Sequence, residues 1–213
     1  MSLPHSLFTC ESLTSLKLTF TQSKTPEIEF PTSVWLPSLK TLRIENSHNA
    51  EKILPGCPVL EEFHFKLGSY SYNCRNISIA NASLQRLIVK GFMQDNYSAS
   101  FLVINCPNLR SLKISWHNGD IKVCELYSLV KADIAIDCRD HWWETLRGRR
   151  NPRILELLES IRHVKSLELS RSTLEGIHFD PYREHKEMKS NTEADELAKS
   201  GIEKATPWNT NFE

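Results

Sequence analysis

The sequence lacks long apolar runs and an excess of charge of either sign. No stretch approaches the 18 consecutive apolar residues of a membrane-spanning helix, and the N-terminal residues lack the pattern of a signal peptide. The 26 Lys and Arg residues balance the 26 Asp and Glu residues. A net charge of zero provides no overall field to attract nucleic acid or an anionic membrane. We therefore predict a cytoplasmic and/or nuclear protein that binds neither a membrane nor nucleic acid.

Catalytic and metal-binding signatures are also missing. The sequence contains no GxSxG, HExxH, GxxxxGK or GxGxxG motif, so the common acyl-transfer, zinc-protease and nucleotide-binding patterns are absent. None of the six cysteines belongs to a CxxC pair, and a zinc site would have to be assembled from distant ligands. We predict no catalytic residue, no metal and no cofactor, and expect a binding protein rather than an enzyme.

A short apolar motif of the form LxxLxL is present instead, in seven copies. They read CESLTSLKL, LPSLKTLRI, CPVLEEFHF, NASLQRLIV, CPNLRSLKI, LYSLVKADI and IRHVKSLEL. Their leading apolar residues, Leu13, Leu39, Leu60, Leu84, Leu109, Leu129 and Val164, lie 26, 21, 24, 25, 20 and 35 residues apart. All but the last spacing are typical of leucine-rich repeats. In each copy the last two apolar residues point to one face of a strand, and the residue between them points to the other.

One such unit cannot bury its apolar face alone, so the copies are expected to stack. We predict an α/β fold, an irregular leucine-rich-repeat solenoid of about seven repeats over residues 1–180, with a parallel β-sheet on its concave face. The Asn or Cys that usually follows the motif is missing, hence the irregularity. A polar, partly helical or disordered tail is expected over residues 181–213.

The convex side is predicted to be largely β, with short helices. Apolar clusters predict strands at residues 27–30, 77–79, 101–104 and 121–123, and a short helix at 49–54. The long last spacing contains an apolar stripe at residues 154–161, which predicts a helix that docks on the last repeat. Cys10, Cys57 and Cys106 share one position before the motif, which favours buried structural thiols there.

The N-terminal end of the solenoid has little chain to cover it. Solenoids need polar capping units at their ends. Leu3, Leu7 and Phe8 lie at this end. We therefore expect an exposed apolar edge at the N-terminus.

The outward position at the centre of each strand defines a candidate binding surface. These positions change from basic to acidic along the chain: Lys17, Arg43, His64, Ile88, Lys113, Asp133 and Glu168. With their neighbours they predict a concave binding strip made of Arg43, His64, Lys66, Arg86, Ile88, Lys90 and Lys113. Such a strip fits an acidic or phosphorylated segment of a target protein. The alternative is an ordinary solvated sheet face, because Glu45 and Glu62 could neutralise much of the strip.

The repeats resemble those of the plant F-box proteins with leucine-rich repeats. The resemblance covers about residues 3–180, in the stretches LPHSLFTCESLTSLKL, LPSLKTLRI, GCPVLEEFHF, CPNLRSLKI and HVKSLELSRSTLEGI. It implies that the repeats hold a target protein, while an N-terminal F-box joins a Skp-type adaptor in a cullin ubiquitin ligase. An F-box has no room before Cys10, and no C-terminal FBD-type domain is evident. We therefore expect a recognition region, which meets the adaptor only if an F-box is supplied elsewhere.

The tail supports an alternative hypothesis. The stretch NTEADELAK resembles the last helix of retroelement-type RNase H, in which an Asp at the position of Asp195 helps to hold metal. Metal-dependent cleavage needs several carboxylates around paired ions, and no strand pattern here supplies the others. The alternative is therefore a truncated or chimeric gene product with an RNase H-like tail and no retained activity.

Overall fold

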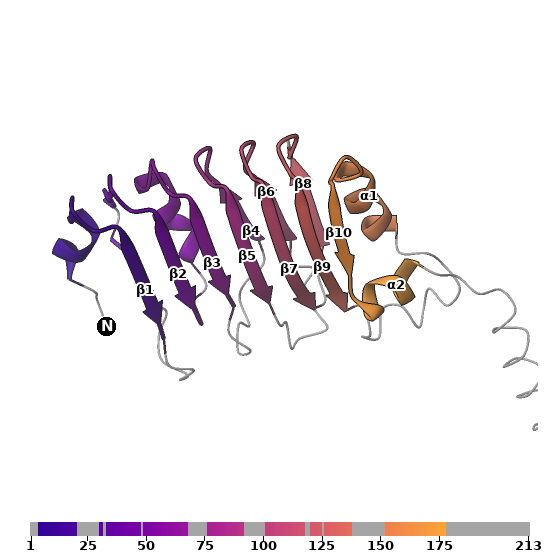
Figure 1. Cartoon of the computed structure of the whole chain (residues 1–213). Helices are drawn as coiled ribbons and strands as arrows, with labels where there is room; N and C mark the ends of the chain where they lie inside the picture. The colour runs from indigo at the N-terminus through magenta and orange to yellow at the C-terminus, as the bar shows by residue number, and fades with distance from the viewer. Residues whose placement is uncertain are drawn as a thin grey trace, which may run out of the picture.

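A computed structural model describes residues 4–20, 30–31, 33–47, 49–67, 76–91, 101–117, 120–124, 126–137 and 152–177. The elements of this part of the chain are η1 (His5–Thr9), β1 (Ser15–Thr19), β2 (Thr41–Glu45), η2 (Ala50–Gly56), β3 (Glu62–Lys66), β4 (Asn76–Ala80), β5 (Arg86–Gly91), β6 (Phe101–Asn105), β7 (Ser111–His117), β8 (Asp120–Cys124), β9 (Lys131–Asp137), α1 (Pro152–Ser160), β10 (Ser166–Leu169) and α2 (Arg171–Ile177). They form an elongated, two-layered solenoid (Figure 1). The predicted solenoid is confirmed.

The larger layer is a seven-stranded parallel sheet. Its strand order, β1-β2-β3-β5-β7-β9-β10, follows the sequence, and each copy of the motif supplies one strand. The strands pair in register: Leu42, for example, lies opposite Leu16 on one side and Phe63 on the other. Equivalent positions of all seven copies therefore form straight columns across the sheet.

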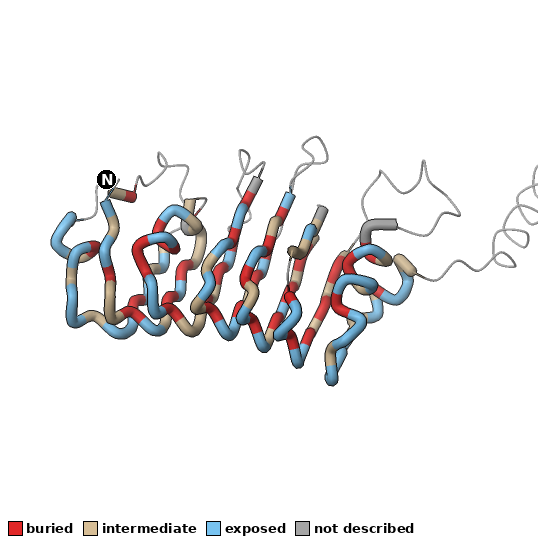
Figure 2. The backbone as a smooth tube through the Cα atoms, turned by 90° about the horizontal axis from the view of Figure 1, so that it is seen from above, coloured by how far each residue is buried: buried red, intermediate tan, exposed pale blue. Residues whose placement is uncertain are grey.

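The inward columns of this sheet form the core. The first column contains Leu16, Leu42, Phe63, Leu87, Leu112, Ala132 and Leu167, and the second contains Leu18, Ile44, Phe65, Val89, Ile114, Ile134 and Leu169. Most of these side chains are fully buried. Viewed from above, buried and exposed residues alternate along the strands (Figure 2). Burial of a Leu, Ile or Phe side chain stabilises the fold by about 1.5–3 kcal/mol, so stacking provides the stability that one unit lacks.

The second layer contains a three-stranded parallel sheet, β4-β6-β8. These strands match three of the four predicted convex strands, and residues 27–29 of the fourth lie outside the described part of the chain. The helix expected at residues 49–54 is present as the 3-10 helix η2, which contains Pro55. Proline has no N–H to donate, which limits this helix to a short, tight form.

The predicted helix in the last spacing is also confirmed. Helix α1 buries Ile154, Leu157 and Ile161 and packs on β8 and α2. After β10, the Thr173 hydroxyl of α2 accepts a hydrogen bond from the Ile136 N–H at 2.8 Å. Strand β10 pairs only with residues 131–134 of β9, so α2 covers the part of β9 that β10 does not reach.

Buried thiols and amides satisfy backbone carbonyls between the layers. The Cys57 and Cys106 thiols are buried and donate to the carbonyls of Ile53 and Ile79, which confirms the prediction at these two positions. Cys10 is only half-buried. The Asn81 side-chain amide donates to the Leu54 and Cys57 carbonyls at 3.2 and 3.1 Å. Such bonds replace part of the regular asparagine ladder.

The ends of the described solenoid differ from the expectation. Phe8 is fully buried and packs edge-on against Phe30, with ring centroids 5.9 Å apart. The prediction of an exposed N-terminal apolar edge is therefore wrong for Phe8, because the Phe30 ring packs on it. Leu7 is half-buried, and Leu3 lies outside the described residues. At the opposite end, Leu167 and Leu174 are 45% and 50% exposed. Within the described ranges, these two residues leave an apolar edge open at the C-terminal end of the stack.

Candidate protein-binding surface

The outward side chains of the concave sheet form three rows across the strands. The first row contains Ser15, Thr41, Glu62, Arg86, Ser111, Lys131 and Ser166; the middle row contains Lys17, Arg43, His64, Ile88, Lys113, Asp133 and Glu168; the third row contains Thr19, Glu45, Lys66, Lys90, Ser115 and Ala135. All seven residues of the predicted strip lie on four adjacent strands, β2, β3, β5 and β7. The fold thus brings them together on one continuous surface.

Glu62 is the centre of an ion-pair cluster within this surface. Its carboxylate lies 3.5 Å from Arg43 Nη2 and 2.9 Å from Arg86 Nη2, and it also contacts His64 Nε2. The side chain of Glu62 is only 17% exposed. Burial raises the pKa of this carboxyl, but the hydrogen bonds from Arg86 and His64, with the charges of these partners, outweigh burial and hold the pKa below its usual value. Glu62 therefore neutralises much of the charge on one side of the strip.

Further cross-strand pairs compensate Lys113 of the strip and Lys17 on the neighbouring strand β1. Lys113 donates to the Asp133 carboxylate, and this hydrogen bond and the charge of Asp133 raise the pKa of Lys113. The amine of Lys17 lies 3.9 Å from Glu45. Exposed pairs of this kind contribute at most about 1 kcal/mol each, so their main effect is on the charge that the surface presents. Lys113 and Asp133 occupy the same position in successive copies of the motif, so the alignment of the copies already places them opposite each other.

Two cations of the third row have no ion-pair partner in the part of the chain that the structure describes. Lys66 and Lys90 are exposed and lie directly opposite each other on β3 and β5. Neither amine has a carboxylate oxygen within 4.0 Å among the residues that the structure describes. Ile88, in the middle row beside them, is half-buried. The predicted basic strip therefore separates into a neutralised part around Glu62 and a positive part at Lys66 and Lys90.

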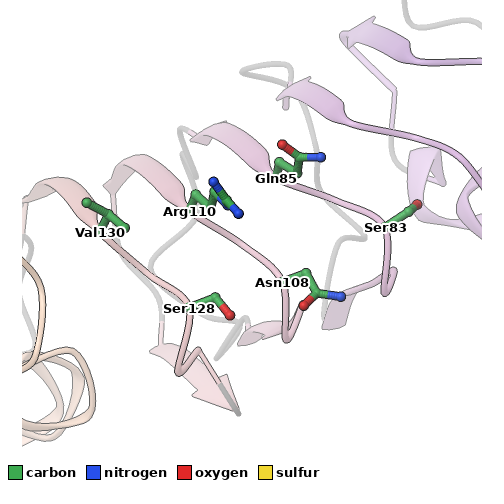
Figure 3. Close-up of a pocket in the computed structure, with 6 residues that line it drawn as sticks. All are labelled: Ser83, Gln85, Asn108, Arg110, Ser128 and Val130. Carbon is green, nitrogen blue, oxygen red and sulfur yellow. The ribbon is translucent and has the colours of Figure 1, made fainter.

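A shallow hollow of about 540 Å³ lies at the N-terminal edge of the same sheet. It is lined by Ser83, Gln85, Asn108, Arg110, Ser128 and Val130. These residues come from the turns that lead into β5, β7 and β9, and Figure 3 shows them in two lines along the edge. The Asn108 amide donates to the Ala82 carbonyl at 2.8 Å, while Arg110 is exposed. The motif did not predict this hollow, although the residues that line it occupy equivalent positions in successive copies of the motif.

No group of three or more His, Cys, Asp or Glu side chains in the described ranges is placed to hold a metal ion. No helix in this part of the chain is both long and apolar enough to cross a membrane. A parallel solenoid with an extended, polar concave face is the architecture of a leucine-rich-repeat interaction module, because its rows of outward side chains offer a broad surface to another protein.

Within this class the chain belongs to a plant F-box family, as the sequence resemblance indicated. The family described as "FBD-associated F-box protein At5g56370, LRR repeats" matches residues 1–132. Three relatives come from Arabidopsis thaliana. The chain is 34% identical to FBD-associated F-box protein At5g56370 over 142 residues, which are 64% of the chain and 32% of the relative. It is 31% identical to putative F-box/FBD/LRR-repeat protein At1g66290 over 182 residues, 81% of the chain and 39% of the relative.

The third relative extends the match along more of the chain. The identity to F-box/FBD/LRR-repeat protein At2g04230 is 32% over 193 residues, 84% of the chain and 40% of that relative. The chain therefore spans about a third to two fifths of the length of the curated relatives it matches. No solved structure matches the chain.

Proposed function

We propose that this chain is a target-recognition module whose concave sheet binds another protein, in the manner of the substrate-recognition region of an SCF-type ubiquitin ligase. The observation that carries the proposal is the continuous outward surface on β2, β3, β5 and β7, in a chain that belongs to the leucine-rich repeats of F-box proteins. The parallel ladder and the buried columns beneath hold these side chains in place. Binding on such a surface costs little ordering entropy.

The binding residues of the proposal are those of the predicted strip: Arg43, His64, Lys66, Arg86, Ile88, Lys90 and Lys113. Ile88 is the apolar centre of the surface, and polar side chains surround it on both neighbouring strands. An apolar centre with a polar rim is the usual arrangement of protein interfaces. Glu62 contributes by orienting the guanidinium groups of Arg43 and Arg86 before the partner arrives.

The proposal also includes assembly of this chain with a ubiquitin ligase. The relatives are named as F-box proteins, and an F-box binds a Skp-type adaptor. In our proposal residues 1–180 supply recognition without catalysis, and the adaptor is engaged through an F-box supplied elsewhere. We propose that such an assembly is located in the cytoplasm, the nucleus or both.

A truncated or chimeric gene product without retained activity is the alternative, and the stretch NTEADELAK favours it. That stretch, Asp195 and the whole tail 181–213 lie outside the described residues. Under this alternative the concave surface has no specific partner. A metal-dependent nuclease assay of the full chain and of Asp195→Asn tests the tail directly: cleavage lost in the variant would overturn the non-enzymatic assignment.

The experiment for the proposal is site-specific photo-crosslinking in plant cell extract. A photoreactive amino acid replaces Ile88 or Lys113 on the concave face, and Lys52 or Lys122 on the convex side as matched controls. We expect the same discrete protein adduct from both concave positions and none from the convex ones. Adducts that are equal on the two sides, or absent from both, would contradict the proposal.

A further inference from the structure

We propose that Lys66 and Lys90 receive a phosphorylated side chain of the partner protein. This inference rests on the proposed function and makes it more specific, because it names the chemical group recognised and the two amines that recognise it. It also divides the predicted strip, since it assigns anion recognition to the third row and not to the arginines around Glu62.

Charge complementarity is the first argument. Arg43, Arg86 and Lys113 already face carboxylates of the same sheet, so a bound anion would have to compete with those partners. Neither the Lys66 amine nor the Lys90 amine lies within 4.0 Å of a carboxylate oxygen of the described residues. The carboxylate opposite Lys66, that of Glu45, is paired with Lys17 instead. A phosphorylated Ser or Thr carries about −1.5 to −2 charges at neutral pH. Two lysines therefore balance one phosphate, whereas a single carboxylate leaves one of them uncompensated.

Geometry is the second argument. Lys66 and Lys90 are paired in register on adjacent strands, and neighbouring strands lie about 4.8 Å apart. Two flexible side chains at that separation can both reach one phosphate group. Like charges directly opposite each other also destabilise a sheet. An anion bound between the two amines removes this repulsion, so binding of the phosphate stabilises the sheet at this position.

The residues on either side of Lys66 and Lys90 in the third row determine on which side of the pair the phosphate is expected to bind. On the β2 side of Lys66 the row continues with Glu45, whose carboxylate is paired with Lys17 and repels an anion. On the β7 side of Lys90 it continues with Ser115, whose hydroxyl is able to donate to a phosphate oxygen, and then with the small Ala135. The phosphate is therefore expected to bind toward β5 and β7, away from β2.

Ile88 indicates which kind of partner residue lies next to the phosphorylated one. It precedes Lys90 by two positions and faces the same side of the sheet, and its side chain is half-buried. A partner segment lying across the sheet would place an apolar side chain on Ile88 while its phosphate meets the two amines. The recognised segment is thus a phosphorylated Ser or Thr with an apolar residue close to it.

The experiment measures binding of the full chain to three fluorescent peptide pools. The pools are identical and degenerate except for a fixed central residue, which is phosphothreonine, threonine or glutamate, and an apolar residue beside it. We expect the phosphothreonine pool to bind at least about tenfold more tightly than either other pool, because charge-assisted hydrogen bonds are the strong ones. Lys66→Gln/Lys90→Gln should abolish this preference.

Lys52→Gln/Lys122→Gln is the matched control, since it removes the same charge from the convex side. It should bind like the wild type. Equal binding of the phosphothreonine and glutamate pools, or a preference that survives in Lys66→Gln/Lys90→Gln, would overturn the phosphate site. Neither result would affect the crosslinking pattern on which the proposed function depends, so the two proposals fail separately.

Discussion

Leu112 and Leu167 occupy the same inward column of the concave sheet, on β7 and β10, yet Leu112 is 1% exposed and Leu167 is 45% exposed. Leu112 has a strand on each side, whereas β10 pairs only with β9 among the described strands. The same residue type in the same position of the motif thus has two environments. Burial in this solenoid comes from the neighbouring units, and its contribution differs between the middle and the end of the stack.

This difference predicts unequal costs of truncation. Leu112→Ala should lower the free energy of unfolding by about 2–5 kcal/mol, as a cavity in a packed core does. Leu167→Ala should lower it by less than about 1 kcal/mol, because little contact is lost at a half-exposed site. Chemical denaturation of both variants measures this. Similar losses would show that another part of the protein covers Leu167.

Gly91 is predicted to be intolerant of a side chain for a steric reason. A Cβ atom at this position would overlap the Cζ3 and Cε3 atoms of the Trp116 ring, which is fully buried. Gly91→Ala should therefore destabilise the protein by about 1–3 kcal/mol, although Gly→Ala at a compatible site is usually stabilising. Ser115→Ala, on the outward face of the same sheet, is the control. A Gly91→Ala variant as stable as the wild type would contradict this packing.

Most of the fold was predictable because the repeat encodes it. The LxxLxL spacing predicts both the strand and its inward face, and the order of the copies predicts the order of the strands. The environment of Phe8 was not predictable, because it depends on a contact with Phe30 far along the chain. That the residues of the proposed strip share one face of the sheet followed from strand alternation, but the division of the strip into a paired part and an unpaired part did not. The pairing of Glu62 with both Arg43 and Arg86 depends on side-chain reach across strands, which the motif does not encode.

The Glu62 cluster predicts a specific dependence of stability on pH. The pKa of Glu62 is lowered in the folded protein, so its stabilising effect is present above the pKa of the unfolded chain and is lost as the pH falls through the folded pKa. Glu62→Gln should cost about 1–2 kcal/mol at pH 7. The difference between wild type and variant should shrink as the pH is lowered toward 3. A difference that stays constant over this range would contradict the proposed role of the carboxylate.

The cysteines are predicted to differ in their reactivity. Burial raises the pKa of the Cys57 and Cys106 thiols to about 11, while a hydrogen bond with the side chain of Ser12 lowers the pKa of the half-buried Cys10. Because the thiolate is the reactive form, iodoacetamide at pH 8 should modify Cys10 in the folded protein and the other two only after unfolding. Timed alkylation with peptide mapping tests this. Rapid modification of Cys57 or Cys106 in the folded state would argue against their burial.

Binding on the concave face is the central claim, and Ile88 is its most direct probe. Its outward side chain lies at the centre of the proposed surface, so Ile88→Arg adds a bulky charge there without entering the core. The decisive measurement is the affinity of the purified chain for its crosslinked partner by isothermal titration calorimetry, with Lys52→Glu on the convex side as control. We predict that Ile88→Arg weakens binding at least about tenfold, the effect of a central interface residue, while Lys52→Glu leaves it unchanged and both variants unfold like the wild type. Wild-type affinity in Ile88→Arg would contradict the account.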